Sequence, residues 1–374
     1  MHRVSITTVN ADENREKLTR RHLPATDWPE PTAITRWSDP DVDCVYLWVD
    51  GEHPDFHSAF RQWRPPVDDG DSVGPRRYRD NGELKHSLRS LECHAPWIDR
   101  VFIVHNGRLP DWLDTSNPRL RTVTHEEIFS DPSVLPTFNS LAIEANLHRI
   151  PGLSKNFLYL NDDFFFGRDT TKEWYLPEDG PPRFFFEPNP ILIPRTSSPV
   201  HDWAYAHTAR LLPRNGPFHS PAFVPSRLSW RSLLGLTPRR HMPAHVPQVY
   251  NLDGICELED RFPSEFRNTR QHRFRAADDL HLRILYAYSR IGTGQLQAVL
   301  LDWSSSDYLF LRLEDDLDST CRALEGIARL APRFICANDD VESAAPNPPA
   351  LAHWREVMEN RYPSASSFEL VGRP

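Results

Sequence analysis

The sequence predicts an α/β protein with a doubly wound, mostly parallel sheet, and three observations support this prediction. Short apolar segments typical of buried strands alternate with amphipathic helical segments between residues 43 and 165. Each strand segment ends in polar or turn-forming residues. Hydrophobic residues make up 39% of the 374 residues, which is enough to fill one large α/β core.

The first half of the chain contains four segments with the composition of buried strands. They are DCVYLWVDG, DRVFIVHNG, the shorter RTVTHEEIF and NFLYLND, at 43–51, 99–107, 121–129 and 156–162. Helices are expected at 81–97, where Leu84, Leu88 and Leu91 recur at helical spacing, and at 139–150. Residues 52–77 are rich in Pro, Gly and Asp, which predicts a loop.

The second half departs from this regular alternation. Residues 170–240 are rich in Pro and aromatic residues, with a weak helical pattern near 201–212. Further elements are two helices, a short strand and a last helix with a polar tail, at 252–262, 278–291, 333–340 and 350–370. We therefore divide the chain into an N-terminal extension, 1–40, and a single domain, 41–370. The domain comprises an α/β core, a Pro-rich and largely helical lid or insertion, and a C-terminal part that returns to the core, at 41–169, 170–300 and 301–370.

Composition and charge argue against several classes of protein. A net charge of −9 is unlike a general nucleic-acid surface. The five cysteines are far apart and form no CxxC pair, which argues against a zinc site or disulfide framework and favours a reducing compartment. The N-terminus has no apolar signal segment. The sequence also contains no run of about 18 apolar residues, the length that a membrane-spanning helix needs. We therefore expect a cytoplasmic protein.

An Asn-Asp-Asp sequence, Asn161 to Asp163, stands between two apolar runs. Adjacent carboxylates beside a core are costly unless a cation pairs them, and oxygen ligands select hard ions such as Mg²⁺ or Mn²⁺. The alternative is that these residues cap a turn or the next helix. Because ligands bind outside the carboxyl ends of strands in such sheets, Asp162 and Asp163 are candidate metal ligands or catalytic groups.

Other polar residues at the expected sheet edge are candidates for substrate binding. Asp50 ends the first strand, where its alternative role is to shape a turn. Arg79 and Asn81 precede one helix, and Asn139 and Ser140 precede another. A helix N-terminus attracts phosphate, but the same residues can simply cap the helix.

Two later segments also carry candidates. Arg273 and Arg275 flank Phe274, so an extended backbone places both on one face, and guanidinium groups suit bidentate phosphate binding. Their alternative role is an ordinary basic rim. Asn338 begins a second Asn-Asp-Asp sequence, for which structural and binding roles are equally open.

Several segments together resemble the Stealth family, the bacterial capsular and exopolysaccharide phosphotransferases. Their animal relative is the catalytic subunit of the lysosomal-enzyme N-acetylglucosamine-1-phosphotransferase. The similar segments include WVDG, RYRDNGELKHSLRSLECHAPWIDRVFIVHNG, LPTFNSLAIEANLHRI, NFLYLNDD, HMPAHV, RFRAADDL and ICANDD. They fall into four blocks at about 42–53, 77–167, 200–293 and 333–370.

The resemblance implies a Rossmann-like fold and a reaction. A sugar-1-phosphate would move from a nucleotide sugar, usually a UDP-sugar, to a hydroxyl of an acceptor glycan with the aid of a divalent cation such as Mg²⁺ or Mn²⁺. The products would be a phosphodiester and the nucleoside monophosphate. Association with the inner face of the membrane would come through capsule-assembly partners.

The resemblance also assigns roles to residues. Asp162 and Asp163 match its Asn-Asp-Asp sequence, Arg275 and Asp279 match positions in its third block, and His241 begins the matching His-Met-Pro. A lone histidine is more often structural, but an imidazole here is suited to proton transfer or phosphate binding. His245 is the weaker candidate of the two histidines.

Two other functions stay open on the sequence. A metal-dependent nucleotide-sugar glycosyltransferase would use a similar sheet and acidic motif but would release the nucleoside diphosphate. A carbohydrate-binding or assembly protein could keep the fold without turnover.

Overall fold

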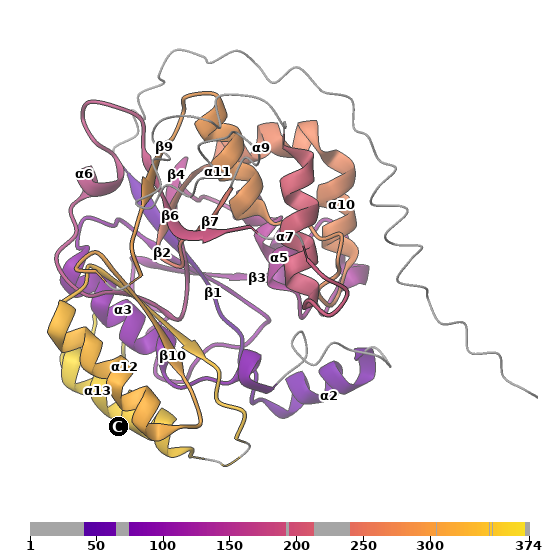
Figure 1. Cartoon of the computed structure of the whole chain (residues 1–374). Helices are drawn as coiled ribbons and strands as arrows, with labels where there is room; N and C mark the ends of the chain where they lie inside the picture. Colours follow the sequence, from indigo (N-terminus) through magenta and orange to yellow (C-terminus); the bar gives the residue numbers. More distant parts are fainter. Residues whose placement is uncertain are drawn as a thin grey trace, which may run out of the picture.

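The computed structural model describes residues 41–64, 75–191, 194–212, 240–303, 305–343, 345 and 347–370, so the expected extension at 1–40 lies outside it. Its main sheet has five strands in the order β3-β2-β1-β4-β8 (Figure 1). The first four strands in this order run parallel, and β8 is antiparallel to β4. The strands span Val42–Leu47 (β1), Val101–His105 (β2), Leu120–Thr124 (β3), Asn156–Asn161 (β4) and Gln248–Asn251 (β8). The predicted mostly parallel α/β sheet is confirmed.

The central position of β1 explains its composition. Cys44 pairs with Val101 on one side and Leu158 on the other, so β1 is covered at both edges. Its residues from Val42 to Tyr46 are all buried. A parallel strand covered on both faces requires a nearly continuous apolar run.

Several helices gather in two groups (Figure 1). One group contains α3 (Glu83–His94), α12 (Leu317–Leu330) and α13 (Pro349–Arg361). The other contains α5 (Ser140–Glu144), α7 (Val200–Leu211), α9 (Leu252–Arg261), α10 (Pro263–Gln271) and α11 (Leu282–Gly292). Short turns are α4 (His125–Ile128), α6 (Lys172–Tyr175), and the 3₁₀ segments η1 (Pro75–Tyr78), η2 (Pro132–Val134) and η3 (Leu147–Arg149).

A second sheet joins the C-terminal part of the chain to the core. It contains β10 (Tyr308–Leu313), β11 (Phe334–Asp339) and β5 (Phe164–Phe166), the strand that directly follows Asp163. Because β11 pairs with β5 in antiparallel register, the chain after residue 300 returns to the Asn-Asp-Asp turn.

Part of the expected helical lid is a sheet instead. The strand β6 (Arg183–Pro190) pairs with β7 (His241–Pro243) and β9 (Gln297–Leu300). Both partners lie far away in the sequence, and Pro188 and Pro190 weaken the local strand pattern, so this pairing is hard to detect from sequence. The expected helices near 201–212, 252–262 and 278–291 are confirmed as α7, α9 and α11, and residues 213–239 lie outside the described part.

Two predictions in the first half were wrong in detail. The expected loop at 52–77 contains the helix α2 (Pro54–Trp63), which His53 caps and whose Phe56 and Phe60 are spaced by one turn. The expected helix at 139–150 ends as an α-helix at Glu144. There the Asn146 side chain donates to the carbonyl of Ala142 at 2.9 Å, in competition with the helical backbone.

No helix within the described ranges is long and apolar enough to cross a lipid bilayer.

A buried ion pair fixes the edge of the sheet opposite the Asn-Asp-Asp turn. Asp43 is fully buried and receives Nε and Nη2 of Arg100 at 3.1 and 2.8 Å, as well as the Ser154 backbone N–H at 2.8 Å. Asp99 also faces Arg100, at 3.5 Å, but its side chain is about half exposed. The same arginine therefore has one buried and one exposed carboxylate partner.

We predict that Asp43→Ala lowers the free energy of unfolding by about 3–5 kcal/mol, because it leaves a guanidinium and a backbone N–H without their buried partner. The matched variant Asp99→Ala should cost less than about 1 kcal/mol. Chemical denaturation of both variants checks this, and equal losses would contradict the buried role of Asp43.

Candidate active site

The Asn-Asp-Asp turn lies at the carboxyl end of β4 and is held from both sides. Asn161 ends β4, and its Oδ1 accepts the Tyr159 hydroxyl at 3.0 Å. The carbonyl of Asp163 accepts the backbone N–H of Ala337 in β11 at 3.1 Å. The rigid turn presents Asp162 and Asp163 at the sheet edge where ligands of parallel α/β sheets bind.

The two carboxylates are held in an environment that disfavours their charge. Burial and, to a smaller extent, the neighbouring Asp163 and Asp80 together raise the pKa of Asp162 to about 8. Burial also raises the pKa of Asp163, although His245 and Arg283 oppose this shift. Within the described part of the chain, the buried Oδ1 of Asp163 has no hydrogen-bond partner. Asp163 therefore has one buried carboxylate oxygen at this turn without a partner among the described residues.

A second acidic group stands beside them at the start of α3. Glu83 is buried, and its pKa is raised well above the usual value by burial, then by Asp162 and Asp80. Asn81 donates its backbone N–H and its Nδ2 to the Glu83 carboxylate at 2.5 and 2.9 Å. The N-cap of α3 is Gly82, in the left-handed conformation at φ +82°. Asn81 therefore does not cap α3, and its side chain binds the Glu83 carboxylate.

The C-terminal Asn-Asp-Asp sequence meets the same group through its second residue. Asp339 accepts Nη1 of Arg79 at 3.2 Å and Nδ2 of Asn81 at 3.2 Å. Arg79 also donates to the carbonyls of Val341 and Ser343. The sequence selected Asn338, but the structure connects Asp339 to the predicted residues Arg79 and Asn81.

Cationic side chains face the acidic turn from the other helical group. Arg283 is buried, with Cζ 5.7 Å from the ring centres of both Tyr159 and Phe164. Arg275 donates to the Ser140 hydroxyl at 3.0 Å. Burial lowers the pKa of the His281 imidazole well below its usual value, and Arg283, Arg275 and His245 add to this effect. Arg283, Arg275 and His245 therefore all act on His281, and of these Arg283 and His245 also act on Asp163.

The structure favours His245 over His241 as a site residue. His245 interacts electrostatically with Asp163, and its Nδ1 lies 2.8 Å from Oε1 of Glu187. The other oxygen of Glu187 accepts Nε1 of Trp303 at 2.5 Å. His241 is buried in β7, with its Nδ1 3.2 Å from the carbonyl of Pro188. The structure thus connects His245 to Asp163 and Glu187, whereas His241 contacts β6; the ranking of the two histidines stays a prediction.

Two predicted binding residues are fully buried and form hydrogen bonds within the protein. Asn139 is fully buried, caps α5 through Leu141, and donates to Oδ2 of Asp279 at 2.8 Å. Asp279 is also fully buried and accepts the backbone N–H of Ala276 and Nδ1 of His272.

Two more predicted residues form hydrogen bonds with backbone groups of the described structure. Arg273 donates to the carbonyls of Ser133, Val134 and Pro136, so it does not share the environment of Arg275. Asp50 accepts the backbone N–H groups of Glu52 and His53, which is the turn role considered as its alternative.

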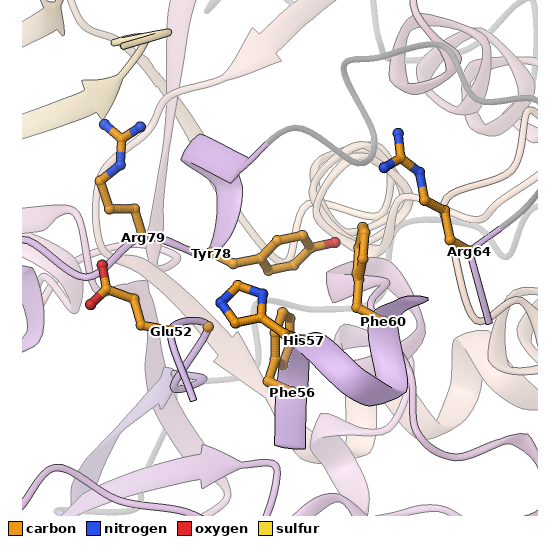
Figure 2. Close-up of a pocket in the computed structure, with 8 residues that line it drawn as sticks. Glu52, Phe56, His57, Phe60, Arg64, Tyr78 and Arg79 are labelled. Carbon is orange, nitrogen blue, oxygen red and sulfur yellow. The ribbon is translucent and has the colours of Figure 1, made fainter. Parts of the chain in front are cut away.

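A pocket opens beside this site, between the end of β1 and α2 (Figure 2). Its volume is about 460 Å³, and it is lined by Gly51, Glu52, Phe56, His57, Phe60, Arg64, Tyr78 and Arg79. Gly51 is required here, since a Cβ at this position would come within 1.9 Å of the Tyr78 carbonyl oxygen. This pocket was not predicted, because residues 52–77 were expected to form a loop and α2 supplies several of its lining residues.

Two family models match the chain. Stealth protein conserved region 2 matches residues 77–184, and Stealth protein conserved region 3 matches residues 244–288. They overlap the second and third blocks of the predicted resemblance, while the blocks at 42–53 and 333–370 stay predictions. All four residues Arg79, Asp162, His245 and Arg275 lie within the matched regions.

Curated relatives extend the similarity over most of the chain. An exopolysaccharide phosphotransferase of Streptomyces coelicolor is 36% identical over 337 residues, which is 88% of this chain and 52% of that protein. The exopolysaccharide phosphotransferase CpsY of Mycobacterium leprae is 33% identical over 88% of this chain and 57% of its own length. The chain thus spans about half the length of these relatives.

Solved structures resemble the chain only weakly. The galactosyltransferase LgtC, in complex with donor and acceptor sugar analogues, aligns with a TM-score of 0.39 and 9% identity, covering 87% of this chain and 97% of LgtC. The bifunctional glycosyltransferase WbbM aligns with a TM-score of 0.38 and 10% identity, covering 90% of this chain and 52% of WbbM. Scores this low carry no argument about function. The two conserved regions, in chain order, and the relatives that match along 88% of the sequence show that the chain belongs to the Stealth protein family.

Proposed function

We propose that the protein transfers a sugar-1-phosphate from a nucleotide sugar, with UDP as the expected nucleotide, to a hydroxyl of an acceptor glycan in exopolysaccharide synthesis. The main support is one arrangement: two carboxylates with raised pKa values lie near the buried Arg283 and a carboxylate-bound histidine at the sheet edge. Phosphoryl transfer needs these three elements, namely charge neutralisation, positioning and a proton acceptor. Relatives called exopolysaccharide phosphotransferases add support.

Asp162 and Asp163 fit the divalent cation that the family implies. Among the described residues, no group of three or more His, Cys, Asp or Glu side chains is arranged to hold a metal ion. Mg²⁺ usually needs only one or two carboxylates, because substrate phosphates and water complete its coordination. The partnerless Oδ1 of Asp163 is suited to such an ion. When bound, the ion would neutralise charge on the phosphate oxygens.

Arg275 and Arg283 would neutralise the opposite side of the pyrophosphate. A planar guanidinium group matches the charge and geometry of phosphate oxygens. Arg275 contacts the Ser140 hydroxyl at 3.0 Å, a neutral partner that a phosphate oxygen can replace with a gain in electrostatic energy. Glu144, buried and bound to Tyr159, adds negative charge near both arginines and so helps to hold them in place.

His245 is the proposed proton acceptor. Glu187 binds Nδ1, so this nitrogen carries the proton in the neutral ring and leaves Nε2 as the basic atom. As the acceptor hydroxyl oxygen bonds to the β-phosphorus, its proton passes to Nε2. The bond from the β-phosphorus to the bridging oxygen breaks, and the electron pair leaves with the nucleoside monophosphate.

The products distinguish this function from its alternatives. The assay mixes the protein with UDP-sugars, oligosaccharide acceptors and Mg²⁺ or Mn²⁺, and separates the nucleotides formed. We expect UMP, only when metal and acceptor are both present. UDP would indicate glycosyl transfer, and no nucleotide from a broad panel of donors and acceptors would favour a binding protein.

We predict that Asp162→Asn abolishes transfer, by about 100-fold or more, yet stabilises the metal-free protein at high pH. Asp162 has a folded pKa of about 8, whereas an unfolded aspartate titrates near 4. Between these values the folded state binds more protons, so the aspartate lowers stability as pH rises, and the full cost applies above pH 8. The amide removes a cost on the order of 2–5 kcal/mol.

Thermal unfolding with a chelator checks this prediction. The melting temperature of Asp162→Asn should match the wild type near pH 4 and exceed it at pH 8.5. Asp318→Asn, at an exposed position in α12, is the matched control and should change neither activity nor the pH dependence. A variant that retains activity would refute the proposed role of Asp162.

We also predict that His245→Gln lowers kcat by about 100-fold or more, because it removes the proton acceptor. His241→Gln should cost less than about tenfold, since a glutamine amide can keep the contact with the Pro188 carbonyl. Steady-state kinetics of both variants decide between the two histidines, and the opposite ranking would restore the order predicted from the sequence.

A further inference from the structure

The pocket between β1 and α2 is distinct from the acidic turn but leads to it. Tyr78 and Arg79 line the pocket and directly precede Asp80, whose charge acts on Asp162. The Tyr78 hydroxyl donates to the carbonyl of Phe138, and the Arg275 charge acts on the Tyr78 ring. A molecule in the pocket would therefore lie next to the proposed phosphate site.

The walls of the pocket are aromatic. Phe56 and Tyr78 have ring centres 5.0 Å apart, and Phe60 lies 5.6 Å from Tyr78. Phe138 and Phe274, stacked at 4.9 Å, support Phe60 from behind and connect it to the segment that carries Arg275. Figure 2 shows the rings of Phe56, Phe60 and Tyr78 between Arg79 and Arg64.

The pocket has a defined position along the site. Leu47 near the end of β1, where the pocket lies, pairs with Asn161 at the end of β4, and β8, which follows His245, pairs with β4 at its other edge. The order is thus the aromatic pocket, then Asp162 and Asp163, then His245. A donor whose phosphates lie at the two aspartates must extend away from His245 to leave room for the acceptor, and the pocket lies in that direction.

We infer that this aromatic pocket, formed by Phe56, Phe60 and Tyr78, binds the nucleobase of the donor. The inference rests on the proposed function, because it assumes a nucleotide donor. A volume of about 460 Å³ is in the range of small-molecule sites and accommodates a nucleoside. Flat bases stack on aromatic side chains, and the phosphates that follow the ribose would reach Arg275 and the two aspartates.

The test measures calorimetrically the binding of UDP and of inorganic pyrophosphate, both with Mg²⁺, to the full chain. Phe60→Leu keeps an apolar side chain but removes the aromatic face. It should weaken UDP about tenfold and leave pyrophosphate unchanged, since pyrophosphate has no base to stack. Trp63→Leu makes the same kind of change on the same helix, outside the pocket lining, and should leave both affinities unchanged.

Unchanged UDP affinity in Phe60→Leu, or equal losses for UDP and pyrophosphate, would overturn the inference. Because Phe60 also packs in the fold, photocrosslinking of 4-thio-UDP to the wild-type protein gives a second test. The label should map to residues 51–64 or 77–79, and a label elsewhere would overturn the inference. UDP binding in the pocket without UMP production would instead contradict only the proposed reaction.

Discussion

The main constraint on this structure is a group of acidic side chains buried close together at one edge of the main sheet, where their like charges carry a free-energy cost. Burial raises the pKa values of Asp162, Asp163 and Glu83; Asp163 also raises that of Asp162, Asp162 raises that of Glu83, and Asp80 raises both of these. A fold selected only for stability would place amides or apolar side chains here. The strain is typical of functional sites, where a bound cation or substrate supplies the missing positive charge.

A second constraint places the cations opposite these acids. The carboxylate of Asp279 accepts the Asn139 amide, the Ala276 backbone N–H and the His272 ring within 2.8 Å. It thereby joins the N-terminus of α5 to the segment of Arg275, which lies next to Ser140. We infer that Asn139 and Asp279 position Arg275, because their hydrogen bond connects the two segments that carry Ser140 and Arg275.

Local sequence patterns were sufficient for the four parallel strands of the main sheet and for the position of its acidic turn, but not for the antiparallel β8. Buried parallel strands are continuous apolar runs, and Asp162 and Asp163 directly follow one of them. Patterns failed where the structure depends on distant partners. The pairing of β6 with β7 and β9, the contact of Asp339 with Arg79, and the choice of His245 over His241 all come from segments far apart in the chain.

These distant contacts also explain why the site cannot exist in a fragment of the domain. The acids come from residues 83 and 162–163, the cations from 275–283, and the residue that holds Arg79 from β11 at 339. Asp162 and Asp163 lie in conserved region 2, whereas Arg275 and Arg283 lie in conserved region 3. The C-terminal strand β11 then closes the structure by pairing with β5 directly after Asp163. Tertiary contacts between segments far apart in the sequence therefore bring the acidic and cationic groups together.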